Sequence, residues 1–230
     1  MNDHTLSKRL ETVASYIPLG ARLADIGSDH AYLPVVLVQQ DKIRSAIAGE
    51  LNDGPFAAAK AQVSALHLDD KIDVRQGDGL SVLKKGEVDC ITICGMGGVL
   101  IKTILEGESE VLPVPKMILQ PNNGEPALRF WLQHNQYRIV SEEIIEENDK
   151  LYEVLIVEPG DQELSEEEVL FGPCLIKNPT NPVFQKKWQD EEGKTKRLLL
   201  SLDQSVNDSS IQEKREQFTN KLRMIQGVIQ

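Results

Sequence analysis

Seven short apolar runs recur along the first 160 residues of this chain and constrain its fold more than any other feature. The runs are 23–26, 46–48, 72–74, 88–94, 117–119, 137–145 and 151–157. Between the first five lie stretches that can form helices, such as the alanine-rich segment 53–68. Because apolar runs that alternate with helical segments are typical of βαβ units, the pattern predicts an α/β domain built on a parallel sheet.

The last two runs are separated only by the polar segment 146–150. Parallel strands need a connection of about a dozen residues or more, so these two strands should pair antiparallel. Five strands in βα units followed by such a hairpin resemble the class I Rossmann-like methyltransferases. We therefore expect a seven-stranded, mostly parallel sheet whose last strand is antiparallel, within a domain over residues 1–160. The sheet of a dinucleotide dehydrogenase is normally parallel throughout.

Residues 161–230 follow a different pattern and are expected to form a second, helical domain. An acidic segment, 161–168, and a turn-rich segment, 178–182, precede two polar stretches that favour helices. Apolar residues recur in them at heptad-like spacing: Phe184, Trp188, Leu198 and Leu202 in the first, with Glu191 and Thr195 interrupting, and Ile211, Phe218, Leu222, Ile225 and Ile229 in the second. With a turn at 207–210, the spacing predicts an antiparallel hairpin of the coiled-coil type.

The charge of the chain is uneven. Its net charge is −11; residues 1–160 hold 15 Lys and Arg against 24 Asp and Glu, whereas residues 172–230 hold 10 against 7. An acidic body argues against a protein that simply coats nucleic-acid phosphates. The mildly basic tail fits either an RNA contact or a solvated helical face.

Several protein classes are disfavoured by what the sequence lacks. No stretch approaches the roughly 18 apolar residues of a membrane span, and the N-terminus does not resemble a signal peptide. The three cysteines predict neither a disulfide framework nor a zinc site. We expect a cytoplasmic protein, monomeric, with no metal and no membrane partner.

The strongest local signal is the run from Asp25 to Pro34, where an apolar strand ends in a glycine turn before a helix. In α/β sheets this place forms a cofactor crevice, and Gly27 lets a ligand approach the backbone closely. The three-glycine dinucleotide fingerprint is missing. An acidic Asp29 suits a cationic sulfonium ligand better than a pyrophosphate. The alternative is a plain turn with Asp29 as the helix N-cap.

Each of the next strand ends also has a polar or glycine feature. Glu50 stands where an acidic residue binds ribose hydroxyls, and Asp78, between two glycines, suits an adenine amino group. The glycines from Gly95 to Gly98 remove bulk, and Gln120 and Asn122 supply amides at the same rim. The competing interpretation of Glu50 is a surface residue in a loop, and that of Asp78 is an Asx turn.

These motifs together resemble the bacterial tRNA (adenine-22-N1)-methyltransferase family, TrmK. The resemblance rests on the run from Asp25 to Pro34, on Gly95 to Gly98 and on Leu119 to Asn122. It covers residues 1–160, and the helical hairpin suits the C-terminal domain of that family. It implies an S-adenosylmethionine-dependent enzyme that methylates N1 of adenine 22 in tRNA; composition and spacing alone indicate only a fold that binds a nucleoside cofactor.

For this reaction we expect Asp29 to stabilise developing positive charge, Tyr32 to stack on the target base, and Asn122 to lie at the reacting centre. His30 either orients the base or merely flanks the helix cap, and Tyr32 is alternatively a packed helix residue. The set expected to bind the cofactor comprises Asp25, Gly27, Ser28, His30, Glu50, Leu51, Gly77, Asp78, Gly79, Gly95, Met96 and Gly97. Two other functions stay open: a small-molecule methyltransferase, which the acidic body favours, and a non-catalytic nucleotide-binding scaffold.

Overall fold

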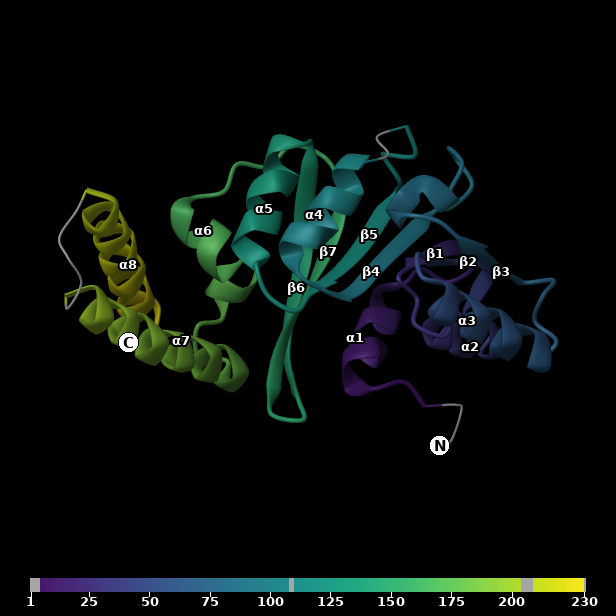
Figure 1. The fold of residues 1–230 in the computed structure, drawn as a ribbon, viewed down its shortest axis with the longest axis horizontal. Coiled ribbons are helices and arrows are strands. Elements are labelled where there is room, and N and C mark those ends of the chain that lie inside the picture. The colour runs from purple at the N-terminus through teal and green to yellow at the C-terminus, as the bar shows by residue number, and fades with distance from the viewer. Residues whose placement is uncertain (1–4, 108–109, 204–208, 230) are drawn as a thin grey trace. The chain divides into compact units, whose positions relative to one another are not determined.

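The computed structural model describes residues 5–107, 110–203 and 209–229. Its centre is a seven-stranded sheet in the order β3-β2-β1-β4-β5-β7-β6 (Figure 1). The strands are β1 (Ala21–Ile26), β2 (Ile43–Glu50), β3 (Ile72–Gln76), β4 (Cys90–Met96), β5 (Lys116–Pro121), β6 (Tyr137–Glu147) and β7 (Lys150–Pro159). The first five pair in parallel, and β7 lies antiparallel between β5 and β6. This is the predicted methyltransferase sheet.

Helices cover both faces of this sheet. They are α1 (Lys8–Tyr16), α2 (Tyr32–Gln39), α3 (Asp53–Ala65), α4 (Gly98–Gly107) and α5 (Glu125–His134), with the short 3₁₀ helix η1 (Gly79–Val82) after β3. Side chains of α1, α2 and α3 share one core with the sheet, while α4 and α5 pack together in front of it (Figure 1). Because both faces are covered, β1 and β5 are buried along almost their whole length.

The chain divides into two compact units after Gly172 rather than at the predicted boundary after residue 160. The first unit also contains α6 (Glu166–Phe171), which begins at Ser165 with a capping box formed with Glu168. The second unit, residues 173–230, contains the 3₁₀ helix η2 (Leu175–Lys177), α7 (Pro182–Asp203) and α8 (Ser209–Val228). The acidic segment is therefore part of the first unit.

A buried ion network explains why α6 belongs there. The fully buried guanidinium of Arg129, on α5, lies 2.8 Å from Glu142 Oε1 on β6 and also pairs with Glu153 on β7. The same guanidinium donates to the carbonyls of Val169 and Leu170 in α6, at 3.4 and 3.3 Å. One side chain thus ties α5, β6, β7 and α6 together.

The second unit contains the predicted pair of helices, although their seam differs in detail. Phe184 and Trp188 are buried in α7 and Ile225 is buried in α8, but Leu198 is 46% exposed and does not belong to a seam. Lys221 Nζ of α8 lies 2.6 Å from Glu191 Oε1 of α7. Residues 207 and 208 of the predicted turn lie outside the described residues, and the coiled-coil assignment remains a prediction.

No helix among the described residues is both long enough and apolar enough to span a membrane.

Candidate active site

The carboxyl ends of β1, β4 and β5 open into a cavity of about 330 Å³, closed on its other side by α1 and the β6–β7 hairpin. Eight of the predicted site residues line it: Asp25, Gly27, Ser28, Asp29, Tyr32, Gly95, Met96 and Asn122. The other lining residues are Arg9, Leu10, Leu33, Cys94 and Tyr152. A cavity at this edge of an α/β sheet is the expected place for a ligand.

Asp25, at the end of β1, fixes the floor of the cavity. Its carboxyl group is almost fully buried, and its two oxygens accept hydrogen bonds from Ser28 Oγ and Thr92 Oγ1, both at 2.6 Å. Burial raises the pKa of Asp25, although both hydroxyl contacts oppose that shift. The carboxyl group therefore anchors the turn from β1 to α2 as well as lining the cavity.

This turn has an unusual backbone conformation. Asp29, His30 and Ala31 all adopt left-handed φ angles, of 46°, 68° and 57°, which side chains with a Cβ rarely do. The N-cap of α2 is therefore Ala31 and not Asp29, so the interpretation of Asp29 as a helix cap is wrong. Strained backbone of this kind clusters at ligand sites and persists where the surroundings hold it in place.

Glu50, at the end of β2, provides that support. Its Oε1 accepts a hydrogen bond of 2.5 Å from the backbone N–H of Asp29. The residue is only 6% exposed, and burial is the main cause that raises its pKa. No partner for the other carboxylate oxygen is found within the described part of the chain, so that oxygen is available to accept from a ligand hydroxyl.

The side chains of Asp29 and His30 in this turn face solvent, whereas Ala31 is buried. Asp29 is 82% exposed, and its Oδ1 lies 3.5 Å from Nε2 of His30. The ring of Tyr32 is partly exposed, with its centroid 5.6 Å from that of His30. Asp29 and Tyr32 line the cavity, whereas His30 does not.

The loop after β3 lies beside Glu50 rather than in the cavity. Gly77 N–H donates to the carbonyl of Glu50 at 2.9 Å, and a Cβ at Gly77 would lie 2.7 Å from Val82 Cγ1. Asp78 caps η1 without a side-chain hydrogen bond, so it forms no Asx-type cap. Glu50, Leu51, Gly77, Asp78 and Gly79 do not line the cavity, and the Gly77 hydrogen bond places this loop next to the backbone of Glu50.

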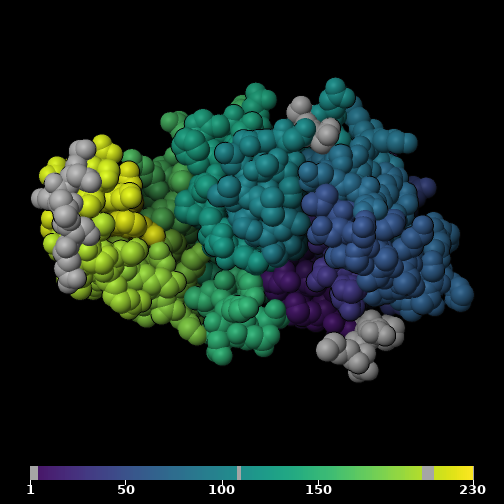
Figure 2. Space-filling view, viewed as in Figure 1, coloured from purple at the N-terminus to yellow at the C-terminus, as the bar shows by residue number. Residues whose placement is uncertain are grey.

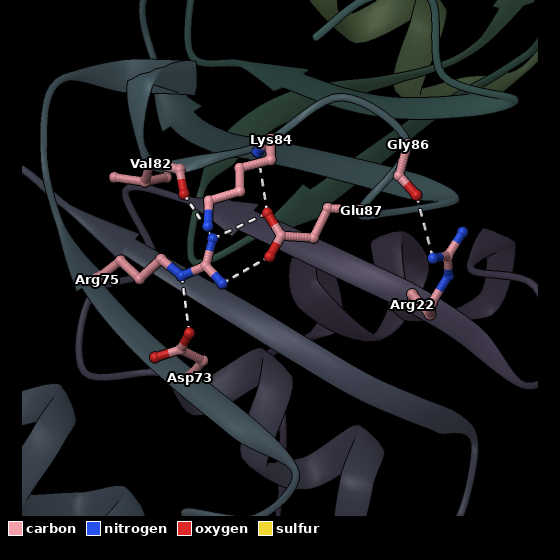
Figure 3. Close-up of polar contacts among 7 residues, drawn as sticks. All are labelled: Arg22, Asp73, Arg75, Val82, Lys84, Gly86 and Glu87. Atoms are coloured by element: carbon pink, nitrogen blue, oxygen red, sulfur yellow. Dashed lines mark hydrogen bonds and ion pairs between the residues drawn. The ribbon is translucent and has the colours of Figure 1, made fainter.

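An arginine at the base of this loop holds it in place (Figure 3). Arg75 donates to Val82 O at 2.7 Å and pairs with both carboxylate oxygens of Glu87, at 2.9 and 2.7 Å, and with Asp73. Glu87 also accepts from Lys84 N, and the Arg75 contact lowers the pKa of Glu87 to about 2. The hydrogen bonds from Arg75 thus fix the loop of residues 77–87 that contains Asp78.

At the ends of β4 and β5 an amide network connects backbone and side chains. Gln120 is fully buried; its Oε1 accepts from Gly95 N–H at 3.0 Å and from Arg9 Nη1 at 2.5 Å. Its Nε2 donates to Asn122 Oδ1 at 3.2 Å, and Asn122 Nδ2 donates to Gly95 O at 2.7 Å. Both predicted amides thus lie at the same rim, with Asn122 lining the cavity.

The glycine run after β4 has two separate uses. Gly95 lines the cavity with a φ of 76°, in keeping with the expected removal of bulk. Gly97 and Gly98 instead face the β5–α5 loop, where a Cβ on Gly98 would lie 2.4 Å from Gly124 O. Gly97, which was predicted to bind the cofactor, does not line the cavity. It lies where two loops approach each other closely.

Arg9 and Tyr152 form a wall that sequence reasoning missed. The Arg9 guanidinium lies 5.5 Å from the centroid of the Tyr152 ring, and the backbone N–H of Arg9 donates to Glu147 Oε1 at 3.2 Å. In Figure 2 the purple surface of α1 lies between the hairpin and the blue surface of the early elements. Nothing in the sequence near Arg9 marks it, because only the tertiary fold brings α1 and the hairpin together.

Cys94 also lines the cavity, and burial raises the pKa of its thiol, which keeps it protonated. Within residues 5–107, 110–203 and 209–229, no group of three or more His, Cys, Asp or Glu side chains is arranged to hold a metal ion. The site thus combines a carboxylate with a free oxygen, a glycine turn, amide groups and two aromatic rings. These groups suit a nucleoside ligand and a second planar base.

Comparison with known proteins identifies the family. A family model described as TrmK, tRNA (adenine(22)-N(1))-methyltransferase, matches residues 23–227. A curated tRNA (adenine(22)-N(1))-methyltransferase from Bacillus subtilis is 45% identical over 236 aligned residues, covering 100% of this chain and 99% of the relative.

Two solved structures extend this similarity to the fold. The crystal structure of B. subtilis TrmK superposes with a TM-score of 0.94 at 45% identity, covering 99% of this chain and all of that one. Streptococcus pneumoniae Sp1610, solved in complex with S-adenosyl-L-methionine, has a TM-score of 0.88 at 45% identity, covering 98% and 100%. The chain described here belongs to the tRNA (adenine(22)-N(1))-methyltransferase family.

Proposed function

We infer that this protein transfers a methyl group from S-adenosylmethionine to N1 of adenine 22 in tRNA. The observation that carries the inference is the hydrogen bond from Asp29 N–H to Glu50, at the end of β2, beside a cavity that Asn122 lines at the end of β5. A nucleoside-binding carboxylate and a base-binding amide thus occupy one edge of the sheet. Membership of the family supplies the identity of the substrate.

The residues present fit S-adenosylmethionine. The nearly buried Glu50 carboxylate has one oxygen available for the ribose hydroxyls. Gly27 has a φ of 70°, and the flexible end of the Met96 side chain lies where a Cβ of residue 27 would stand, so a ligand approaches this backbone once Met96 moves. Asp78, in the loop held by Arg75, would accept from the adenine amino group. When bound, the cofactor supplies an electrophilic methyl group on a positively charged sulfur.

The target nitrogen needs no strong base. The in-plane lone pair of adenine N1 forms the new N–C bond as the S–C bond breaks, so the sulfur leaves as a neutral thioether and the base becomes cationic. Alignment of the reacting atoms therefore supplies much of the acceleration. A carboxylate at the mouth of the cavity, Asp29, stabilises the charge that develops on the base.

The base must leave its stack before it reacts, because N1 lies on the Watson–Crick edge. Tyr32, partly exposed at the rim, offers an aromatic face for the extruded adenine, and His30 lies beside that ring. Asn122 holds the base in the cavity. We propose these roles together with the assignment of the cofactor-binding residues.

The second unit is the proposed RNA-binding element. It contains nine basic side chains in its two helices: Lys186, Lys187, Lys194, Lys196, Arg197, Lys214, Arg215, Lys221 and Arg223. Phosphate contacts through these groups make binding salt-dependent. The protein is proposed to act as a monomer in the cytoplasm. Truncation after Gly172 should lower tRNA affinity, whereas a changed oligomeric mass would instead identify a dimerisation element.

The test is a methylation assay with labelled cofactor on unmodified tRNA and, in parallel, on a pool of small metabolites. The inference requires label in tRNA and 1-methyladenosine after nuclease digestion and mass analysis. Label in the metabolite pool alone would identify a small-molecule methyltransferase. Cofactor binding without transfer to any RNA would identify a non-catalytic scaffold.

A further inference from the structure

The side-chain amide of Asn122 is only half used by the protein. Its Nδ2 donates to Gly95 O at 2.7 Å, and its Oδ1 accepts from Gln120 Nε2 at 3.2 Å. An asparagine amide has two N–H donors and two acceptor lone pairs. One donor and one lone pair therefore remain on an exposed residue that lines the cavity.

The orientation of this amide is determined by its neighbours. Arg9 Nη1 and Gly95 N–H both donate to Gln120 Oε1, so a flipped Gln120 would bring its own donor against two others. Gln120 Nε2 is thereby directed at Pro121 O and Asn122 Oδ1. This in turn requires Asn122 to present its oxygen to Gln120 and its nitrogen to Gly95 O.

The chemistry of the reaction limits which edge of adenine the enzyme can recognise. The methyl group arrives at N1, so a contact that covers N1 would block the reaction. The adjoining Hoogsteen edge stays free, and it carries the N6 amino donor and the N7 acceptor. This pair is the one that an asparagine amide binds with one acceptor and one donor, whereas guanine presents two acceptors at the same positions.

We propose that Asn122 recognises the target adenine through N6 and N7, and that Arg9 and Gln120 are positioning residues that fix the amide orientation this contact needs. The proposal rests on the proposed function and deepens it, because it names the edge of the base that gives specificity. Arg9 acts through Gln120, and Asn122 is the group that touches the base.

The experiment is a chemical double-mutant cycle. tRNA is assembled with adenosine or with 7-deazaadenosine, which has C–H in place of N7, at position 22. The kcat/KM of the full-length wild-type protein and of Asn122→Asp is measured on both tRNAs. Wild type should lose about tenfold on the 7-deaza substrate, the scale of one unpaired hydrogen bond. Asn122→Asp has lost the donor and should show a difference below twofold. Any effect of N7 on tRNA folding is shared by both enzymes and cancels.

The positioning role has its own readout. Gln120→Glu keeps the acceptor for Arg9 and Gly95 but removes the donor to Asn122, and Arg9→Met releases Gln120. Both variants should lower kcat. The loss of kcat/KM on the 7-deaza tRNA should be at most half of the tenfold loss of the wild type, and the affinity for S-adenosylmethionine in calorimetry should stay unchanged. Arg138→Met, which alters an exposed arginine at the start of β6, is the matched control and should keep the full effect.

The outcomes separate this proposal from the function on which it rests. Absence of 1-methyladenosine on natural tRNA overturns the proposed function. Normal methylation with no wild-type preference for the N7-containing tRNA, or an equal preference in Asn122→Asp, overturns recognition through N7. If Arg9→Met and Gln120→Glu both keep the full preference and the wild-type kcat, Arg9 and Gln120 are not positioning residues.

Discussion

The backbone N–H of Asp29 donates to Glu50 Oε1 over 2.5 Å, so the loops after β1 and β2 are tied together at the cofactor edge. Replacing Glu50 by Ala removes this acceptor and the proposed ribose contact. We expect Glu50→Ala to weaken S-adenosylmethionine binding by about 1–3 kcal/mol. Glu50→Gln keeps one acceptor and should lose less. Titration calorimetry checks both, and unchanged affinity in Glu50→Ala would exclude the ribose contact.

Asp29 can be tested without affecting stability, because its side chain is 82% exposed. We expect Asp29→Ala to abolish methyl transfer while the melting temperature stays within about 2 °C of wild type. Single-turnover kinetics and thermal melting measure the two effects. Near-normal turnover would remove Asp29 from the mechanism.

The network around Arg129 predicts a large effect on stability. Arg129→Met leaves the carboxyl groups of Glu142 and Glu153 buried without their guanidinium partner. Breaking a buried pair from one side costs about 3–5 kcal/mol, which denaturant titration should detect. The exposed pair of Arg138 and Glu158 is the control, and Arg138→Met should change stability by less than about 1 kcal/mol. Equal small losses for both variants would contradict the assigned role of Arg129.

The ion pair between Arg75 and Glu87 predicts a pH-dependent contribution to stability. Folding lowers the pKa of Glu87 to about 2, so the pair stabilises the fold fully above the ordinary carboxyl pKa and loses this contribution as pH falls towards 2. We expect Glu87→Gln to be less stable than wild type by about 1 kcal/mol at pH 7, with the difference vanishing at low pH. A difference that persists at pH 2 would show that the cause is packing and not charge.

Sequence patterns identified the features that lie in short segments. The strand ends at Asp25, Glu50, Gly95 and Asn122 could be predicted because a glycine or polar residue directly follows each apolar run. The antiparallel β7 followed from the length of one connection. These features depend on neighbouring residues and on the common edge of a parallel sheet.

Features that depend on tertiary contacts were not predicted. Arg9 and Tyr152 meet only because α1 packs on the hairpin, and the apolar pattern before β1 is too short to predict that helix. The left-handed turn over Asp29 to Ala31 is held by Glu50, 21 residues after Asp29, so neighbouring residues alone left a conventional helix cap as an alternative. The unit boundary moved to Gly172 because Arg129 binds α6 from a distant helix.

The basic residues of α7 and α8 predict a salt effect. Replacing Arg197 and Lys214 by Gln removes two positive charges, so the slope of log affinity for tRNA against log salt should become shallower by up to about 2. Binding measured across a salt series checks this, and cofactor affinity should not change. An unchanged slope would show that these side chains do not contact phosphates.

The position of the methyl group on the RNA decides whether adenine 22 is the target. After incubation of unmodified tRNA with the protein and S-adenosylmethionine, reverse transcription should stop next to position 22, because a methyl at N1 blocks base pairing. A tRNA with guanosine at position 22 should give no stop. A stop at another position, or none with the adenosine-22 tRNA, would overturn the proposed methylation of adenine 22.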